Sequence, residues 1–215
     1  MKPGTEPAPG QELRSIFDLL YRAYGPQHWW PGESALEVVV GSVLTQNTAW
    51  ANVEKAIANL KQRGLLDLDR LAAMPPSRLA TIIRPAGFFR LKARRLLSVL
   101  RWLRSRSGFP GVLGMPTETL RHELLACNGV GPETADSILL YALNRPVFVV
   151  DSYTRRILFR YGLLQGDENY PAIQSWFHRC LGPNVELYNE FHALFVRLAK
   201  KHCRARAMCQ GCPLS

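Results

Sequence analysis

The sequence predicts an all-α protein. Apolar residues recur at helical spacing in separate blocks, and Gly or Pro stands in most of the gaps between them, as helix ends require. The β-branched segment VFVV at 147–150 is too short and too isolated to build a sheet, so we expect an extended or helix-entry segment there. With 215 residues and 47% hydrophobic residues, the chain has enough apolar material for a sizeable core, in one large domain or two small ones.

The expected helices follow from these blocks in chain order. Residues 1–10 come first, and their Pro/Gly-rich composition predicts a disordered tail. The helical blocks are 11–24, 33–45, 49–63, 68–73, 77–83, 89–106, 117–126, 132–143, 151–161, 169–180 and 185–202.

Charge and cysteine content narrow the functional classes. The net charge of +10 suits a polyanionic partner, although basic proteins without nucleic-acid ligands are common. No apolar run is long enough to span a membrane and the amino terminus lacks the apolar core of a signal peptide, so we expect a cytoplasmic protein without a membrane partner. Cys127 and Cys180 are isolated, whereas Cys203, Cys209 and Cys212 lie close together, which favours metal over disulfides.

The segment GVGPETADSILLYAL, 129–143, begins with a glycine turn that leads directly into an apolar helix. Gly129 and Gly131 permit positive φ and close approach of another backbone, and Pro132 suits a first helical position. The free N–H groups at the start of the helix suit a phosphate oxygen. Two helices joined by such a hairpin can grip a DNA backbone without reading bases, and the alternative is a plain connection between two helices.

The chain resembles the DNA glycosylases of the endonuclease III superfamily in three separated motifs. LLACNGVGPETADSILLYAL followed by VFVVDSYTRRI resembles their helix–hairpin–helix and aspartate, VVVGSVLTQNTAWANVEKAI resembles an early helix–loop–helix, and CRARAMCQGC resembles their iron–sulfur loop. The resemblance implies a six-helix barrel domain at 33–142 and a second helical domain from 11–32 and 143–215. It also implies a monomer acting on double-stranded DNA in the nucleoid, with the damaged base flipped into a cleft between the domains.

Asp151 matches the catalytic aspartate of this superfamily. Cleavage of an N-glycosidic bond builds positive charge on the sugar, which a carboxylate stabilises while it orients or deprotonates a water. The alternative is that Asp151 caps the helix that follows it, and both roles are compatible. Bifunctional relatives carry a lysine where this chain has Glu133, so the resemblance implies a monofunctional enzyme that leaves an abasic site. The alternative for Glu133 is a first-turn acid that the helix dipole favours.

Within the superfamily, HWWPGES, LTQNTAWANVEKA and IRPAGFFRLKARRL most resemble the 3-methyladenine DNA glycosylases of endonuclease III type. A methylated purine is cationic, so stacking on aromatic rings gains cation–π energy. The candidate base-pocket residues are Trp29, Trp30, Pro31, Trp50 and Glu133, although packing between domains would also explain the adjacent tryptophans.

Candidate DNA contacts come from the hairpin and from the early motif. Gln46 matches the side chain that such enzymes insert where a nucleotide has flipped out, and otherwise is a polar helix-end residue. The whole predicted set is Gln46, Asn47, Gly129, Val130, Gly131 and Thr134. The basic helix at 91–106, preceded by Arg90, is expected to be a solvated face over an apolar stripe that also adds backbone affinity.

The cysteine-rich tail resembles a [4Fe–4S] loop in part. The superfamily spaces four cysteines six, two and five residues apart, whereas Cys203, Cys209 and Cys212 show intervening spacings of five and two. A shortened chain, a non-cysteine ligand or a degenerate site would each account for the unidentified fourth ligand, and zinc with His202 is a further alternative. The loop would hold Lys200, Lys201, Arg204 and Arg206 near the DNA backbone.

Two other functions stay open at this point. One is a uracil, thymine or adenine mismatch glycosylase of the same superfamily, and the other is a non-catalytic hairpin DNA-binding protein.

Overall fold

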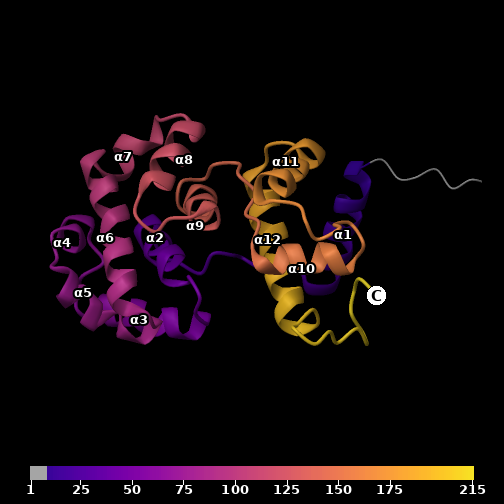
Figure 1. Ribbon diagram of the computed structural model, residues 1–215, viewed down its shortest axis with the longest axis horizontal. Helices are drawn as coiled ribbons and strands as arrows, with labels where there is room; N and C mark the ends of the chain where they lie inside the picture. The colour runs from indigo at the N-terminus through magenta and orange to yellow at the C-terminus, as the bar shows by residue number, and fades with distance from the viewer. Residues whose placement is uncertain (1–8) are drawn as a thin grey trace, which may run out of the picture. The chain divides into compact units, whose positions relative to one another are not determined.

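The computed structural model describes residues 9–215, and this part of the chain contains helices and no strand (Figure 1). The all-α prediction is therefore confirmed. The helices are α1 (Pro9–Tyr24), α2 (Ala35–Leu44), α3 (Trp50–Gln62), α4 (Leu68–Ala72), α5 (Pro76–Ile82), η1 (Arg84–Ala86), α6 (Phe89–Ser105), α7 (Gly108–Leu113), α8 (Thr117–Ala126), α9 (Pro132–Ser137), η2 (Ile138–Ala142), α10 (Ser152–Arg160), α11 (Tyr170–Leu181) and α12 (Val185–Lys201).

Several details differ from the sequence-based expectation, among them the short η1, which lies between two expected blocks. Helix α1 begins at Pro9, so the expected tail overlaps it by two residues, and the rest of that tail lies outside the described residues. Helix α7 was not expected, because its sequence GFPGVL combines two glycines with a proline. The block 132–143 is split, since residues 138–142 widen into a π-helix after the α-helical turns of α9.

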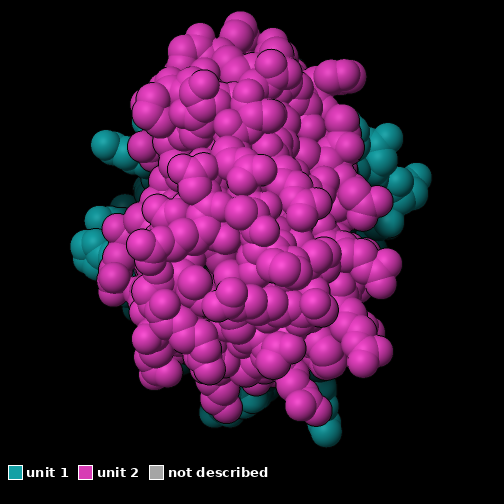
Figure 2. Space-filling view, turned by 90° about the vertical axis from the view of Figure 1, so that its left-hand side faces the viewer, with its two compact units in different colours: residues 1–30, 146–215 teal, residues 31–145 magenta. Residues whose placement is uncertain are grey.

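The chain divides into two compact units. One unit is the continuous segment 31–145, and the other combines residues up to 30 with 146–215 (Figure 2). These ranges lie close to those expected for the two domains. The assignment of a six-helix barrel to the first range stays a prediction.

The continuous unit is built around α2 and α6. Every residue of α2 from Leu36 to Leu44 is buried, and the helix packs against α3, α6, α9 and η2. Helix α6 buries an apolar stripe while its arginines lie on the other faces, so the core contains both helices.

The discontinuous unit has an aromatic core. Phe148, from the segment between η2 and α10, stacks on Phe177 of α11 with ring centroids 3.7 Å apart. Phe191 and Phe195 of α12 pack edge-on against Phe177. This core holds the segment that leads to Asp151 against α11 and α12.

Candidate active site and nucleic-acid interface

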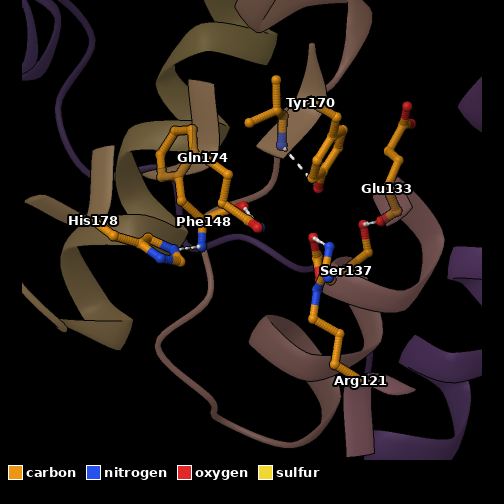
Figure 3. Close-up of polar contacts among 9 residues, drawn as sticks. Arg121, Glu133, Ser137, Phe148, Tyr170, Gln174 and His178 are labelled. Atoms are coloured by element: carbon orange, nitrogen blue, oxygen red, sulfur yellow. Dashed lines mark hydrogen bonds and ion pairs between the residues drawn. The ribbon is translucent and has the colours of Figure 1, made fainter. Parts of the chain in front are cut away.

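The segment that carries Asp151 is held by side chains of one helix instead of by a sheet. Tyr170, Gln174 and His178 lie four residues apart on α11 and therefore share one face (Figure 3). The Val150 N–H donates to the Tyr170 hydroxyl at 3.3 Å. Phe148 accepts from Gln174 Nε2 at 2.7 Å through its carbonyl and donates its N–H to His178 Nε2 at 3.0 Å. These bonds provide partners for the N–H and C=O groups of a buried extended segment, which pairs with no strand among residues 9–215.

Asp151 lies at the end of this segment and caps α10. Its Oδ1 accepts hydrogen bonds from the Thr154 N–H at 2.7 Å and from the Thr154 hydroxyl at 2.9 Å. Its Oδ2 lies 3.5 Å from Nε2 of His192 on α12. Asp151 is 8% exposed, and one carboxylate oxygen serves the helix cap while the other faces a buried imidazole.

The charge state of Asp151 follows from two opposing effects. Burial raises the pKa of this carboxyl, but hydrogen bonding with His192, the charge of that imidazole and the two bonds from Thr154 outweigh burial. The pKa of Asp151 therefore lies below its ordinary value, and the side chain is a carboxylate at neutral pH. The expected capping role is confirmed by these contacts, and they leave Oδ2 outside the cap.

The hairpin between α8 and α9 uses a positive φ at one of its two glycines. Gly129 has φ +76° and lies against Arg95 of α6, whose Cγ would be only 2.4 Å from an added Cβ. Gly131 has φ −95°, so the positive φ that a glycine permits is not used there. Val130 is 7% exposed and its N–H donates to the Cys127 carbonyl, which makes it a core residue whose amide is already bonded.

Gln46 is tied to the hairpin. Its Nε2 donates to the Thr134 hydroxyl at 2.9 Å and to the Gly129 carbonyl at 3.1 Å. Its Oε1 accepts from Nη1 of Arg95 at 2.6 Å. The early motif and the hairpin, more than 80 residues apart, thus meet through one glutamine. Asn47 follows at φ +50° and is exposed.

A buried lysine supports the loop that carries Gln46. Lys92 is 1% exposed, and its Nζ donates to the Leu44 carbonyl at 2.9 Å and to the Ala86 carbonyl at 2.7 Å. Burial, with a smaller effect from the nearby charge of Arg95, lowers the pKa of Lys92 to about 8. The lysine joins the carboxyl end of α2 to η1.

The candidate base-pocket residues fall in different units. Trp50 donates its indole N–H to Glu54 at 2.8 Å. Trp29 and Trp30 lie against each other with ring centroids 5.4 Å apart, and the Lys200 ammonium lies 5.8 Å from the Trp29 ring. Trp50 belongs to the continuous unit and the adjacent tryptophans to the discontinuous one, so the pocket they would share stays a prediction.

Glu133 and Pro31 belong to the continuous unit as well. The Glu133 carbonyl accepts from the Ser137 hydroxyl at 2.7 Å, while the Glu133 side chain extends away from Ser137 (Figure 3). Pro31 is exposed. Glu133 lies in the first turn of α9, which is the dipole-favoured position expected for an acid.

The cysteine-rich tail is joined to α10 by two arginines. Arg156 donates to the Cys203 carbonyl at 2.8 Å, and Arg160 donates to Cys203 Sγ at 3.3 Å and to the Arg204 carbonyl at 2.6 Å. His202 is 9% exposed, and its Nδ1 lies 3.1 Å from the Met208 carbonyl. The tail is thus tied to the helix that Asp151 caps.

The three thiols do not fit a four-ligand cluster as the structure places them. Cys203, Cys209 and Cys212 line one small cavity of about 100 Å³ together with His202. Within residues 9–215, however, no three His, Cys, Asp or Glu side chains are grouped so that they could hold a metal ion. A [4Fe–4S] centre needs four ligands, whereas the described tail offers three thiols.

Sequence reasoning did not single out several residues that complete the site. His192 and the α11 face reach Asp151 and its segment only through tertiary packing. A signal for His192 existed, because α12 places this histidine on its apolar, buried face. Arg95 and Lys92 were hidden in a basic helix whose other arginines lie at the surface. No helix within the described range is long and apolar enough to cross a membrane.

Comparisons with known proteins agree with this architecture. The model of the "HhH-GPD superfamily base excision DNA repair protein" family matches residues 40–186. A candidate DNA repair glycosylase of Methanocaldococcus jannaschii is 46% identical over 94% of this chain and 93% of its own. The crystal structure of the Helicobacter pylori 3-methyladenine DNA glycosylase bound to 1,N6-ethenoadenine is 30% identical, with a TM-score of 0.73, covering 89% of this chain and 95% of that one. An endonuclease III–DNA complex shares the fold at 24% identity, with a TM-score of 0.80 over 95% and 92% of the two chains.

Proposed function

Because the chain belongs to the HhH-GPD superfamily of base excision DNA repair proteins, we propose that it is a monofunctional glycosylase that removes alkylated purines such as 3-methyladenine. The observation that carries this proposal is the Asp151 carboxylate, whose Oδ2 is not used by the helix cap. Likeness to a 3-methyladenine DNA glycosylase over most of both chains supports the substrate class.

The proposed reaction uses the charge of Asp151. As the bond between base and sugar breaks, positive charge develops on the sugar, and a carboxylate kept ionised by its surroundings stabilises that charge. The same oxygen can orient or deprotonate the attacking water. A cationic methylated purine leaves readily, so no strong general acid is required for its departure.

The proposed base pocket is aromatic. Trp50 is partly exposed at the start of α3, and Trp29 and Trp30 form an aromatic pair. A positively charged base stacked on such rings gains about 0.5–2 kcal/mol of cation–π energy. An uncharged normal purine gains no such term, so aromatic stacking favours the alkylated base.

Glu133 supports a monofunctional reaction. A carboxylate cannot form a Schiff base with the sugar, so Asp151 would act with water and the product would be an abasic site. Gln46, freed from its bonds to Arg95 and Thr134, would occupy the gap left by the flipped nucleotide.

The test is an excision assay on three duplexes, containing an alkylated purine, uracil or a G·T mismatch, with strand breaks scored before and after alkali. We expect base loss from alkylated DNA alone, with breaks only after alkali. Release of uracil or thymine would assign the chain to mismatch repair. Breaks before alkali would show that a lysine performs lyase chemistry.

A second candidate, a non-catalytic DNA-binding protein, is favoured by the tight anchoring of Gln46 on the hairpin. Such a protein would bind all three duplexes and release no base from any of them. The same assay therefore separates the two candidates.

A further inference from the structure

The continuous unit has a cavity of about 550 Å³ between α5, η1 and α6. Three arginines line it, Arg84 from η1 and Arg90 and Arg94 from α6, and we call it the arginine pocket. Phe89 forms part of the wall, with the guanidinium carbons of Arg84 and Arg90 5.8 and 5.9 Å from its ring centroid. No Asp or Glu lines the pocket.

The three arginines are unpaired within residues 9–215. None of them forms an ion pair or a side-chain hydrogen bond there, and stacking on Phe89 is the interaction that Arg84 and Arg90 make. Three other cations of this unit do form ion pairs: Lys61 with Glu33 and Glu37, Arg106 with Glu123 and Arg121 with Asp136. Within residues 9–215 the arginine pocket therefore groups three positive charges in one cavity without a carboxylate partner.

Grouped like charges cost stability when nothing neutralises them. Arg90 and Arg94 are four residues apart on α6, a spacing at which like charges repel each other on a helix surface. A guanidinium presents a planar fork of donors that matches the oxygens of a phosphate. The chemistry that would neutralise the arginine pocket is thus a phosphate group.

The position of the pocket on α6 favours a phosphate of DNA over a free anion. Arg94 lines the pocket, and the next residue, Arg95, lies against Gly129 of the hairpin and binds Gln46. Consecutive Cα atoms are about 3.8 Å apart, so one helix connects the hairpin with the pocket. We expect a DNA backbone bound at the hairpin to continue along α6 toward these guanidinium groups.

We propose that the arginine pocket binds backbone phosphates of duplex DNA, as a sequence-independent contact separate from the hairpin and the base site. This inference rests on DNA being the substrate of the proposed function. It does not depend on which base is removed.

The test measures binding of the full chain to an undamaged, fluorescently labelled duplex at increasing salt concentration. The variant Arg84→Gln/Arg90→Gln/Arg94→Gln removes the three charges, and Arg63→Gln/Arg70→Gln/Arg104→Gln is the matched control on exposed arginines outside the pocket. Each lost phosphate contact lowers the slope of log K against log salt by about 0.9, so we expect a decrease of about 2 to 3 in the pocket variant. We expect a smaller change in the control.

Further outcomes decide the proposal. Equal slopes for wild type and pocket variant, or equal decreases in pocket variant and control, would overturn it. The triple Arg→Lys variant keeps the charge and should restore most of the slope. Thermal stabilisation of wild type by inorganic phosphate alone, with an unchanged DNA slope in the pocket variant, would assign the pocket to a free anion and refute the DNA contact. Melting temperatures check that the variants fold, and we expect no decrease because the repulsion is removed.

Single-turnover excision with saturating protein separates this proposal from the proposed function. If wild type releases no base but the slope of log K against log salt still decreases in the pocket variant, the pocket proposal holds and the glycosylase assignment fails. If wild type releases alkylated bases and the slope is unchanged in the variant, the pocket proposal fails and the glycosylase assignment stands.

Discussion

Asp151 combines a structural and a proposed chemical role, and substitutions can separate them. Asn is as good an N-cap as Asp, so Asp151→Asn keeps an acceptor for Thr154 and removes the negative charge. Asp151→Ala removes both the cap and the charge. The two variants therefore share the chemical defect and differ in the structural one.

The magnitudes follow from the contacts. Loss of an N-cap costs about 0.5–2 kcal/mol. Thr154 is fully buried, so its unbonded donors add a desolvation penalty of about 1–3 kcal/mol in the alanine variant. We expect Asp151→Ala to lose about 2–4 kcal/mol of unfolding free energy, and Asp151→Asn to lose much less. Loss of one preorganised electrostatic contact lowers a rate by about 100-fold to 1,000-fold, and we expect that decrease in both variants.

The assay combines urea unfolding with single-turnover excision of an alkylated base. The expected result is two variants with equally low excision rates and clearly different stabilities. Wild-type excision by Asp151→Asn would refute the catalytic assignment and leave Asp151 as a helix cap alone. An excision rate that follows stability across the series would lead to the same conclusion.

Three further predictions concern stability. The pKa of Lys92 falls from 10.5 to about 8 in the folded protein, which corresponds to about 3 kcal/mol. Between these pH values the unfolded state binds more protons than the folded state, so the unfolding free energy of wild type should rise from pH 8 to 10.5. Urea unfolding at several pH values should show this rise in wild type and a flatter dependence in Lys92→Met. Gly129→Ala should lose about 1–2 kcal/mol of unfolding free energy because of its positive φ, and more because the added Cβ displaces Arg95. Gly131→Ala has nothing within 4 Å of the added Cβ, so it should melt like wild type. Equal melting temperatures for the two variants would contradict the hairpin geometry. The lowered pKa of Asp151 stabilises the fold at pH values above the ordinary Asp pKa of about 4, and this contribution is lost as the pH falls through the lower pKa of the folded state. The unfolding free energy should therefore decrease more steeply with falling pH in wild type than in Asp151→Asn.

The spacing of apolar residues was sufficient to predict most of the helices, because these helices bury an apolar stripe. The expected ends of the blocks differ from the observed ones by at most about two residues, and α7 was missed because Gly and Pro occupy half of its positions. A chain pattern reports which face of a helix is apolar. It does not report that the segment GFPGVL packs against α6 as a helix.

A residue of the candidate site could be predicted from the sequence where a single motif contains it and also indicates its role. Asp151 and Gln46 could be named from their motifs, whereas their partners His192 and Arg95 come from distant helices that only the fold brings near. Val130 and Gly131 show the limit within a motif. Membership of the hairpin did not reveal that one is a core residue and the other has an ordinary backbone conformation.

The α11 face that binds residues 148 and 150 has a consequence for hydrogen exchange. The amides of Phe148 and Val150 donate to His178 and Tyr170, so they are shielded as amides in a β-sheet would be, although the described chain contains no strand. Their exchange requires opening of the aromatic core instead of fraying at a sheet edge. Two slowly exchanging amides in an otherwise irregular segment would therefore report directly on the rigidity of the backbone that places the carboxylate.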